Sequence, residues 1–352
     1  MICSKMYSDE LKYYAESNAD ILSALEGKCV LITGAAALIG TYLIDLLMVF
    51  GEISGKRIRV IAVDKNSAEM ESRFSCFGDN EALILMTLDV SETAPDVREG
   101  VDYIIHAASN TSPVDYANDP VGTMNTNVIG TYRLLEFARE NGVKRFLLCS
   151  SVEAYGQNVS DAGDFDELSS GYVDCNTARA AYPSAKRASE SMCCAYNSQY
   201  SIDYVTARIG RIYGPTVYLN DTKAPTQFIL NAVRGENVVL KSNGMQLFSY
   251  GYVGDCVTAM LTILVRGECA QAYNIADSAS KIRLKDFAGF CAAAAGTELV
   301  FVQQNEVEKK GYSKITQATL NTEKLESLGW HAEFSAEEGV KRTVSYIKNY
   351  RR

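Results

Sequence analysis

With 352 residues, 47% of them hydrophobic, the chain can bury a large core and folds as one large or two modest domains. Its net charge of -9 at pH 7 argues against a nucleic-acid partner, and without an apolar run of membrane-spanning length or a secretory signal we expect a cytoplasmic protein with no membrane partner. The ten cysteines lack the paired spacing of metal ligands, so we predict reduced thiols and no metal site.

Residues 8–26 precede the first predicted strand and carry apolar side chains at helical spacing. The pattern predicts an amphipathic helix packed on the edge of a sheet, within an N-terminal extension over residues 1–27. Its apolar positions are Leu11, Tyr14, Ile21, Leu22 and Leu25.

The stretch KCVLITGAAALIG at 28–40 is typical of a dinucleotide-binding turn. A short apolar run, 30–32, predicts a buried strand, Gly34 allows a sharp turn, and apolar residues at helical spacing follow from Leu38 to about residue 50. The free N–H groups at the start of such a helix can hold a pyrophosphate. By itself the pattern also fits a helix that merely packs on a sheet.

A second predicted strand, 58–63, ends at Asp64, near the interval at which an acidic residue accepts the hydroxyls of the adenosine ribose. Its carboxylate would repel a 2′-phosphate, which favours NAD over NADP. The alternative is an ordinary aspartate in a turn at the end of a strand.

Two more predicted strands support the first interpretation. Strand 83–88 ends in Asp89-Val90, and strand 103–106 runs into Ala107-Ala108-Ser109. Strands that alternate with helices predict a parallel, doubly wound α/β sheet, with its ligand at the carboxyl ends of the strands. His106 lies at such an end, and we expect it to be a packing residue.

A fifth predicted strand, 145–149, leads into SSVEAYG at 150–156, and Tyr182-Pro-Ser-Ala-Lys186 follows. Tyr182 and Lys186 are four residues apart and share a helix face. A tyrosine ordinarily loses its proton near about pH 10, but a neighbouring ammonium and an oxidised nicotinamide would both favour the phenolate. Tyr182 is therefore a candidate general base, and Ser151 a candidate hydrogen-bond partner of the same substrate hydroxyl. Alone, the Y-x-x-x-K spacing also fits a pair on a helix surface.

Together these motifs resemble the extended short-chain dehydrogenase/reductase family that acts on nucleotide sugars. The similarity runs from residue 28 to about 345 and includes T-G-x-x-G-x-x-G, in which Thr33, Gly34 and Gly40 match and Ala37 replaces the middle glycine. HAAS at 106–109 resembles H-x-A-A, and the segment from Asn127 to Thr131 resembles N-x-x-G-T. In the family this asparagine braces the active-site backbone, whereas alone it reads as a helix cap.

The resemblance implies a Rossmann-type doubly wound parallel sheet with a smaller, mixed α/β C-terminal substrate domain. It implies oxidation of the sugar C4 hydroxyl with recycled NAD, a nucleotide-diphosphate sugar as substrate, and a homodimer. The expected cofactor-binding residues are Gly34, Ala37, Leu38, Ile39, Gly40, Asp64, Asp89, Val90, Ala107, Ala108, Ser109, Tyr182 and Lys186.

The residues after Ser151 bear on the reaction type. Dehydratases of the family read T-D-E-V-Y-G, decarboxylases read S/T-S-E-V-Y-G, and simple 4-epimerases usually lack the glutamate. This chain reads S-V-E-A-Y-G, with Glu153 present and Val152 in place of the acid that would protonate a departing hydroxyl. The pattern favours a decarboxylase or dehydratase with Ser151, Glu153, Tyr182 and Lys186 as catalytic residues, although a surface glutamate in a loop stays open.

The C-terminal half of the chain lacks basic residues that the family has at two positions. TARIGRIYGP at 206–215 has Arg211 where the family has asparagine, and QLFSYGYVGD at 246–255 has Phe248 where the family has the arginine that grips the diphosphate. A second family arginine is missing near residues 311–313. Arg211, Lys223 and Lys241 are candidates to replace this charge, and each fits a solvated surface residue equally well. The predicted substrate-binding residues are Asn127, Arg211, Lys223 and Phe248.

Later elements complete the prediction. We expect a strand at 272–276 that returns to the sheet edge, a helix ending at Gly296, a last helix from about Ala336, and a packing role for Trp330. The predicted NAD-binding domain spans 28–215, and 216–352 is mainly the substrate-binding domain. The main functional prediction is a decarboxylase or dehydratase of nucleotide sugars. The alternatives are a nucleotide-sugar 4-epimerase and a non-catalytic regulatory protein that binds NAD.

Overall fold

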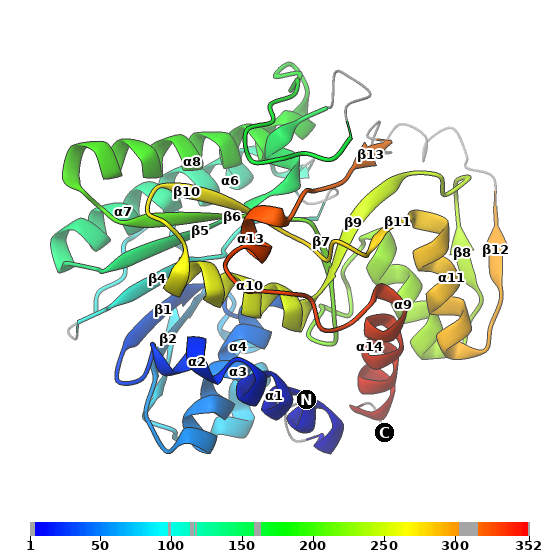
Figure 1. Ribbon diagram of the computed structural model, residues 1–352, viewed down its shortest axis with the longest axis horizontal. Helices are drawn as coiled ribbons and strands as arrows, with labels where there is room; N and C mark the ends of the chain where they lie inside the picture. Colours follow the sequence, from blue (N-terminus) through cyan, green and yellow to red (C-terminus); the bar gives the residue numbers. More distant parts are fainter. Residues whose placement is uncertain are drawn as a thin grey trace.

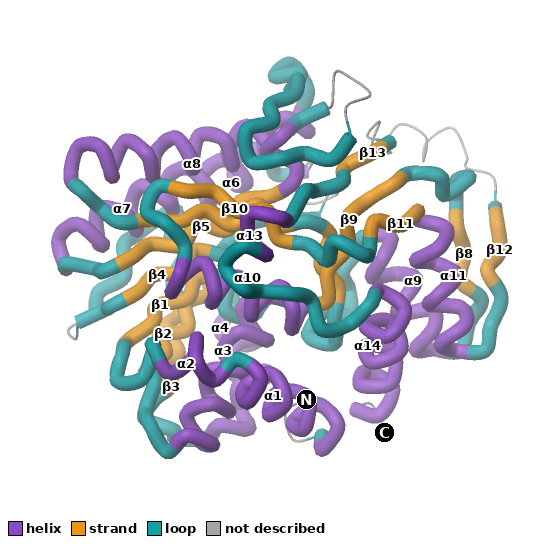
Figure 2. Tube along the Cα trace, viewed as in Figure 1, coloured by secondary structure: helices purple, strands orange, loops and turns teal. Residues whose placement is uncertain are grey.

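A computed structural model describes residues 4–97, 100–112, 116, 118–157, 163–302 and 316–350 (Figures 1 and 2). Its centre is a seven-stranded parallel sheet in the order β10-β6-β5-β4-β1-β2-β3. The strands are β1 (Cys29–Thr33), β2 (Arg59–Asp64), β3 (Leu83–Thr87), β4 (Tyr103–His106), β5 (Arg145–Ser151), β6 (Tyr204–Ile209) and β10 (Gln271–Ile275).

Helices cover both faces of this sheet, which confirms the predicted doubly wound architecture. Side chains of β1 alternate between two cores, with Val30 and Ile32 in one and Cys29 and Leu31 in the other. In Figure 1, α7 (Gly130–Asn141) and α8 (Ala181–Tyr200) lie on one face, and α3 (Leu38–Ser54) and α10 (Val253–Arg266) lie on the other. The strand order reverses around β1, and ligands bind at such a reversal in α/β sheets.

Smaller sheets lie beside the central one, on the right in Figure 1. In the larger of them, β9 (Leu247–Tyr252) pairs with β7 (Arg211–Tyr213), β11 (Lys281–Arg283) and β13 (Gln317–Ala318). A second pair consists of β8 (Val238–Leu240) and β12 (Leu299–Phe301). The helices of this region are α9 (Ala224–Arg234), α11 (Leu284–Ala295) and α14 (Ala336–Tyr350), whereas α13 (Glu323–Glu326) packs on β10 of the central sheet.

The prediction of one N-terminal helix on the sheet edge is wrong. Residues 5–23 form two helices, α1 (Lys5–Ser17) and α2 (Ala19–Ser23), and α1 packs on α3 and α10, outside the sheet. The reason is a buried polar contact that the hydrophobic pattern does not reveal. Glu10 accepts hydrogen bonds from Tyr42, Tyr252 and Tyr346, which lie on α3, β9 and α14.

The remaining elements connect the strands of the central sheet. They are α4 (Ser67–Phe74), α6 (Pro120–Met124), a π-helical turn over Asn125–Ile129, and 3-10 turns at Ser75–Phe77, Val152–Tyr155 and Ala178–Ala180. Trp330 is buried and its Nε1 donates to Thr258 Oγ1 of α10 at 3.0 Å, which fits the predicted packing role. Across the described ranges, every helix is too short or too polar to traverse a lipid bilayer.

Candidate active site

A cavity of about 590 Å³ opens at the carboxyl ends of the central strands. Every predicted cofactor-binding and catalytic residue contributes to its wall, together with Arg211 and Lys223. These residues are Gly34, Ala37, Leu38, Ile39, Gly40, Asp64, Asp89, Val90, Ala107, Ala108, Ser109, Ser151, Glu153, Tyr182 and Lys186. The fold therefore brings together side chains that are far apart in the sequence.

The turn between β1 and α3 requires its glycines. Gly34 has φ +71°, and a Cβ there would lie 2.8 Å from the backbone of Ala107 and Ala108. A Cβ on Gly40 would lie 2.2 Å from the carbonyl oxygen of Gly34. Strand β4 and the first turn of α3 thus approach the turn closely, as the motif predicts.

Ala37 replaces the middle glycine without backbone strain. Its φ of -80° is ordinary for an L-residue, and it is the N-cap of α3 on the cavity wall. The first N–H groups of α3 have no partner within the helix and lie at this wall. A pyrophosphate fits this position.

Asp64 ends β2 and also holds the glycine turn. Its carboxylate accepts the N–H groups of Ala36 at 3.1 Å and of Asn66 at 3.0 Å. A carboxylate fixed at the end of the second strand fits the ribose of an adenine dinucleotide. The described residues therefore fit NAD.

Ser151, Tyr182 and Lys186 form a connected group at the end of β5 and the start of α8. The Ser151 hydroxyl hydrogen-bonds the Tyr182 phenol, and Lys186 Nζ lies 5.6 Å from the centre of the Tyr182 ring. Lys186 is buried, and its ammonium donates to the carbonyl oxygen of Cys149 at 2.7 Å. The sequence prediction of a shared helix face is confirmed.

Burial dominates the electrostatics of this group. Burial raises the pKa of Tyr182 above its ordinary value, and the nearby Glu153 raises it further, while the Ser151 hydrogen bond opposes both. Burial also lowers the pKa of Lys186 to about 8. Both shifts follow from removal of the two groups from water. The predicted role of Tyr182 as a base near neutrality depends on the Lys186 ammonium together with an oxidised nicotinamide, and it stays a prediction.

Tyr116 is a site residue that sequence analysis missed. Its ring stacks on that of Tyr182, with centroids 5.3 Å apart and planes at 12°. Arg179 Nη2 donates to the Tyr116 hydroxyl at 3.2 Å. Burial raises the pKa of Tyr116 to about 12, with a further contribution from Glu153. No local pattern marks this residue, because the stack joins two distant segments.

A polar cluster behind the catalytic group was also missed. Ser150 donates to Glu190, and Arg208 Nη2 contacts the same carboxylate at 2.7 Å. Glu190 lies one turn after Lys186 and opposes the burial that lowers the lysine pKa. The cluster fixes the end of β5 against α8.

The predicted substrate-binding residues occupy different places. Asn127 is buried behind the wall and donates to Ser109 Oγ at 3.0 Å and to the Thr123 carbonyl oxygen at 2.8 Å, which is a bracing geometry. Lys223 Nζ reaches across the cavity to Thr111 Oγ1 at 2.9 Å and pairs with Asp221 at 3.4 Å.

Arg211 and Phe248 lie against each other. The guanidinium carbon of Arg211, on the cavity wall, is 3.7 Å from the centre of the Phe248 ring. Phe248 is 4% exposed, beneath the arginine. The segment at 311–313, where the sequence lacks the second arginine of the family, lies outside the described residues.

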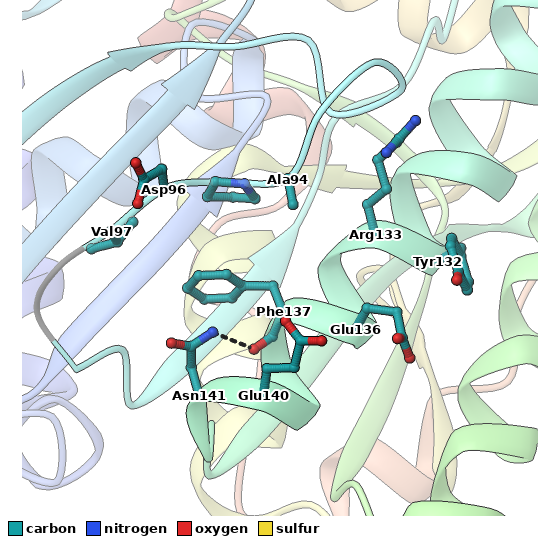
Figure 3. Close-up of a pocket in the computed structure, with 10 residues that line it drawn as sticks. Ala94, Asp96, Val97, Tyr132, Arg133, Glu136, Phe137, Glu140 and Asn141 are labelled. Carbon is teal, nitrogen blue, oxygen red and sulfur yellow. Dashed lines mark hydrogen bonds between the residues drawn. The ribbon is translucent and has the colours of Figure 1, made fainter.

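A second, smaller hollow of about 360 Å³ lies between α7 and residues 94–97 (Figure 3). Its wall carries the carboxylates of Asp96, Glu136 and Glu140 and the guanidinium of Arg133. This acidic lining disfavours an anionic ligand. The larger cavity is therefore the candidate active site.

The sequence profile described as the NAD dependent epimerase/dehydratase family matches residues 30–276. The chain belongs to this family. The predicted family, its enzymatic character and NAD as its cofactor are confirmed.

Relatives and solved structures agree with this assignment. The chain is similar to UDP-glucuronic acid decarboxylase 1 of Xenopus tropicalis, at 31% identity over 330 residues, which are 93% of this chain and 74% of the relative. Its fold is similar to that of an epimerase from Methanothermobacter thermautotrophicus, with a TM-score of 0.79, 22% identity and coverage of 94% of this chain and 95% of the other. The UDP-glucose 4-epimerase of Thermotoga maritima has a TM-score of 0.77 and 23% identity, with coverage of 92% and 100%. At these identities the two structures show the fold alone.

Proposed function

We propose that this protein oxidises the C4 hydroxyl of a nucleotide-activated uronic acid and decarboxylates the resulting 4-keto sugar, with UDP-glucuronate as the substrate. The observation that carries this proposal is the position of Glu153 on the wall of the cavity that is also lined by Ser151, Tyr182 and Lys186. The similarity to UDP-glucuronic acid decarboxylases over most of the chain supports the same reaction.

When bound, NAD supplies the hydride acceptor and a positive charge beside the phenol. Ser151 is placed to hydrogen-bond the C4 hydroxyl and to hold it against the Tyr182 oxygen. As the phenolate, Tyr182 accepts the hydroxyl proton while the C4 carbonyl forms, and the Lys186 ammonium one helical turn away stabilises that phenolate before the transfer.

After the oxidation, loss of carbon dioxide from the keto sugar requires only one proton transfer from the protein. The C5–C6 bond breaks, its electron pair moves into an enolate at C4, and C5 then takes up a proton. Glu153 lies on the cavity wall, and we assign to it the delivery of that proton. Val152 offers no acid to protonate a departing C6 hydroxyl, so decarboxylation fits the site better than dehydration.

The test is to incubate the purified protein with NAD and UDP-glucuronate, UDP-glucose or dTDP-glucose and to follow the products by mass spectrometry. We expect loss of carbon dioxide from UDP-glucuronate. Loss of water, or altered stereochemistry at unchanged mass, would show a dehydratase or a 4-epimerase instead. Tight NAD binding without turnover of any of the three would support the non-catalytic alternative, and Tyr182→Phe is the inactive control.

We also propose that residues 28–215 bind NAD and carry the catalytic groups, whereas 216–352 mainly bind the substrate.

We propose further that the protein is a cytoplasmic homodimer. The dimer is supported by a set of exposed apolar side chains in and between α6 and α7, namely Val121, Met124, Ile129 and Tyr132. Sedimentation of the wild type and of Tyr132→Glu, which should dissociate the dimer, tests the assembly.

A further inference from the structure

Arg211 and Phe248 form a rigid pair on two neighbouring strands. Strands β7 and β9 are parallel, and Arg211 lies opposite Tyr250, two residues beyond Phe248. The guanidinium carbon is 3.7 Å from the centre of the Phe248 ring, and the ring is buried. Contact this close restricts the arginine side chain and holds its charge at a fixed point of the cavity wall.

The hydrogen-bonding capacity of this arginine is incompletely used. Its Nε is buried and has no acceptor among the described residues. A phenyl ring attracts the cation but does not replace an anionic acceptor in line with the N–H group. Lys223 is different, because Asp221 already compensates its charge.

The charge of Arg211 affects a side chain beside the catalytic group. Arg211 opposes the burial that raises the pKa of Tyr116, whose ring stacks on that of Tyr182. Arg211 and Glu153 both belong to the cavity wall. An anionic group held by Arg211 would therefore lie on the substrate side of the site.

The two positions also depart from the resembled family pattern together. Arg211 stands where the pattern has asparagine, and Phe248 stands where it has an arginine. Because the two side chains are in contact, we treat these two departures as one coupled exchange: the cation of this chain lies on β7, and a ring on β9 lies against it.

We propose that Arg211, supported by Phe248, binds anionic oxygens of the nucleotide sugar and replaces the arginine missing at position 248. The planar guanidinium suits two oxygens of a phosphate or a carboxylate. These oxygens belong either to the diphosphate or to the C5 carboxylate of the sugar. The assignment deepens the proposed function and depends on a nucleotide-sugar ligand.

Calorimetric titration of the NAD-loaded protein with UDP, UDP-glucose and UDP-glucuronate tests the proposal. We expect Arg211→Gln to raise Kd at least about tenfold, since a charge-assisted hydrogen bond is lost. Weaker binding of all three ligands identifies the diphosphate, whereas weaker binding of UDP-glucuronate alone identifies the carboxylate. Kd values within twofold of the wild type for all three ligands would overturn the proposal.

The exchange itself has a sharper test. Phe248→Ala should weaken the same ligands less than Arg211→Gln does, because it removes only the support. The double variant R211N/F248R, which restores the family pattern, should bind more tightly than R211N alone. Equal affinity of these two variants would contradict the coupled exchange.

Two controls distinguish a specific loss of ligand binding from misfolding of a variant. Arg57→Gln removes an exposed arginine that pairs with Glu81 outside the cavity and should leave every Kd unchanged. Melting temperature and NAD affinity verify that each variant is folded. If UDP binds in an Arg211-dependent manner but no nucleotide sugar is converted, the proposed function fails and the Arg211 assignment stands.

Discussion

Burial governs the chemistry of the catalytic side chains. Tyr182 and Lys186 are both enclosed, and enclosure shifts both pKa values toward the neutral forms, upward for the phenol and downward to about 8 for the amine. The apo protein therefore keeps a neutral phenol beside an ammonium that is readily lost. Proton transfer at Tyr182 should depend on positive charge that arrives with the ligands.

The lysine pKa predicts an alkaline limit to activity. Below pH 8 the Lys186 amine is charged and stabilises the phenolate, and above pH 8 it loses its proton, so kcat/KM should fall as the pH rises through about 8. Lys186→Arg keeps a charge at high pH and should remove this limit, although its basal rate will be lower. A profile measured from pH 6 to 10 checks the prediction, and a wild-type rate that still rises above pH 9 would contradict it.

Replacement of Glu153 separates oxidation from the later step. Glu153→Gln keeps the size of the side chain but removes a proton carrier, so the rate of product formation should fall by about 10²–10⁴-fold. The C4 oxidation depends on Ser151 and Tyr182 and should persist, visible as NADH absorbance in a single turnover. Loss of the NADH signal together with product formation would show that Glu153 serves the oxidation itself. Glu167→Gln, outside the cavity wall, is the matched control.

At the scale of elements, helix α1 is held by polar contacts of one buried side chain as well as by hydrophobic packing. The Glu10 side chain is fully buried and accepts hydrogen bonds from three tyrosines and from Arg342 Nη1 at 3.3 Å. The contacts connect α1 with α3, β9 and α14. Figure 1 shows the two chain ends close together at this point. The N-terminal helix is therefore part of the packed structure.

Removal of this acceptor should destabilise the protein strongly. Glu10→Ala leaves three buried tyrosine hydroxyls without this acceptor and removes one carboxylate partner of Arg342. We expect a loss of about 3–5 kcal/mol in the free energy of unfolding. Urea denaturation measures the change. Glu16→Ala, on the exposed face of the same helix, should cost less than about 0.5 kcal/mol. Equal effects of the two substitutions would refute the network.

At the scale of the whole molecule, the cavity joins separate parts of the chain. Lys223 contacts Thr111, and the hydroxyls of Thr222 and Ser112 lie 3.1 Å apart, so residues 221–223 meet the segment after β4 across the cavity. The cavity wall includes Val217 of one core, Val90 of the other and Ile212 of β7, so a ligand there would contact the central and the smaller sheets. Binding should therefore stabilise the whole fold.

NAD should raise the thermal unfolding midpoint of the protein. At a concentration of 100 Kd the stabilisation is about 2.7 kcal/mol, because only the native state binds the ligand. NADP at the same concentration should stabilise less, since the Asp64 carboxylate at the end of β2 repels a 2′-phosphate. Asp64→Ala should reduce the difference between the midpoint shifts caused by NAD and by NADP. A wild-type midpoint that rises equally with both dinucleotides would contradict this role of Asp64.

The sequence by itself determined the features that depend on local patterns. Apolar runs placed most strands of the central sheet, Gly34 and Gly40 marked the close turn, and the four-residue spacing of Tyr182 and Lys186 put both on one helix face. Each signal is local because the period of a strand or helix, or the φ of a glycine, is set by neighbouring residues.

Only the tertiary structure decided the contacts between distant segments. No local pattern relates Tyr116 to Tyr182, or Arg211 to Phe248, yet each pair is in contact in the fold. The same holds for the contacts of Glu10 that place α1. The raised pKa of Tyr182 likewise follows from burial in the folded protein. Their physical reason is shared. Desolvation and side-chain packing depend on which surfaces meet after folding, and residue order along the chain does not specify that locally.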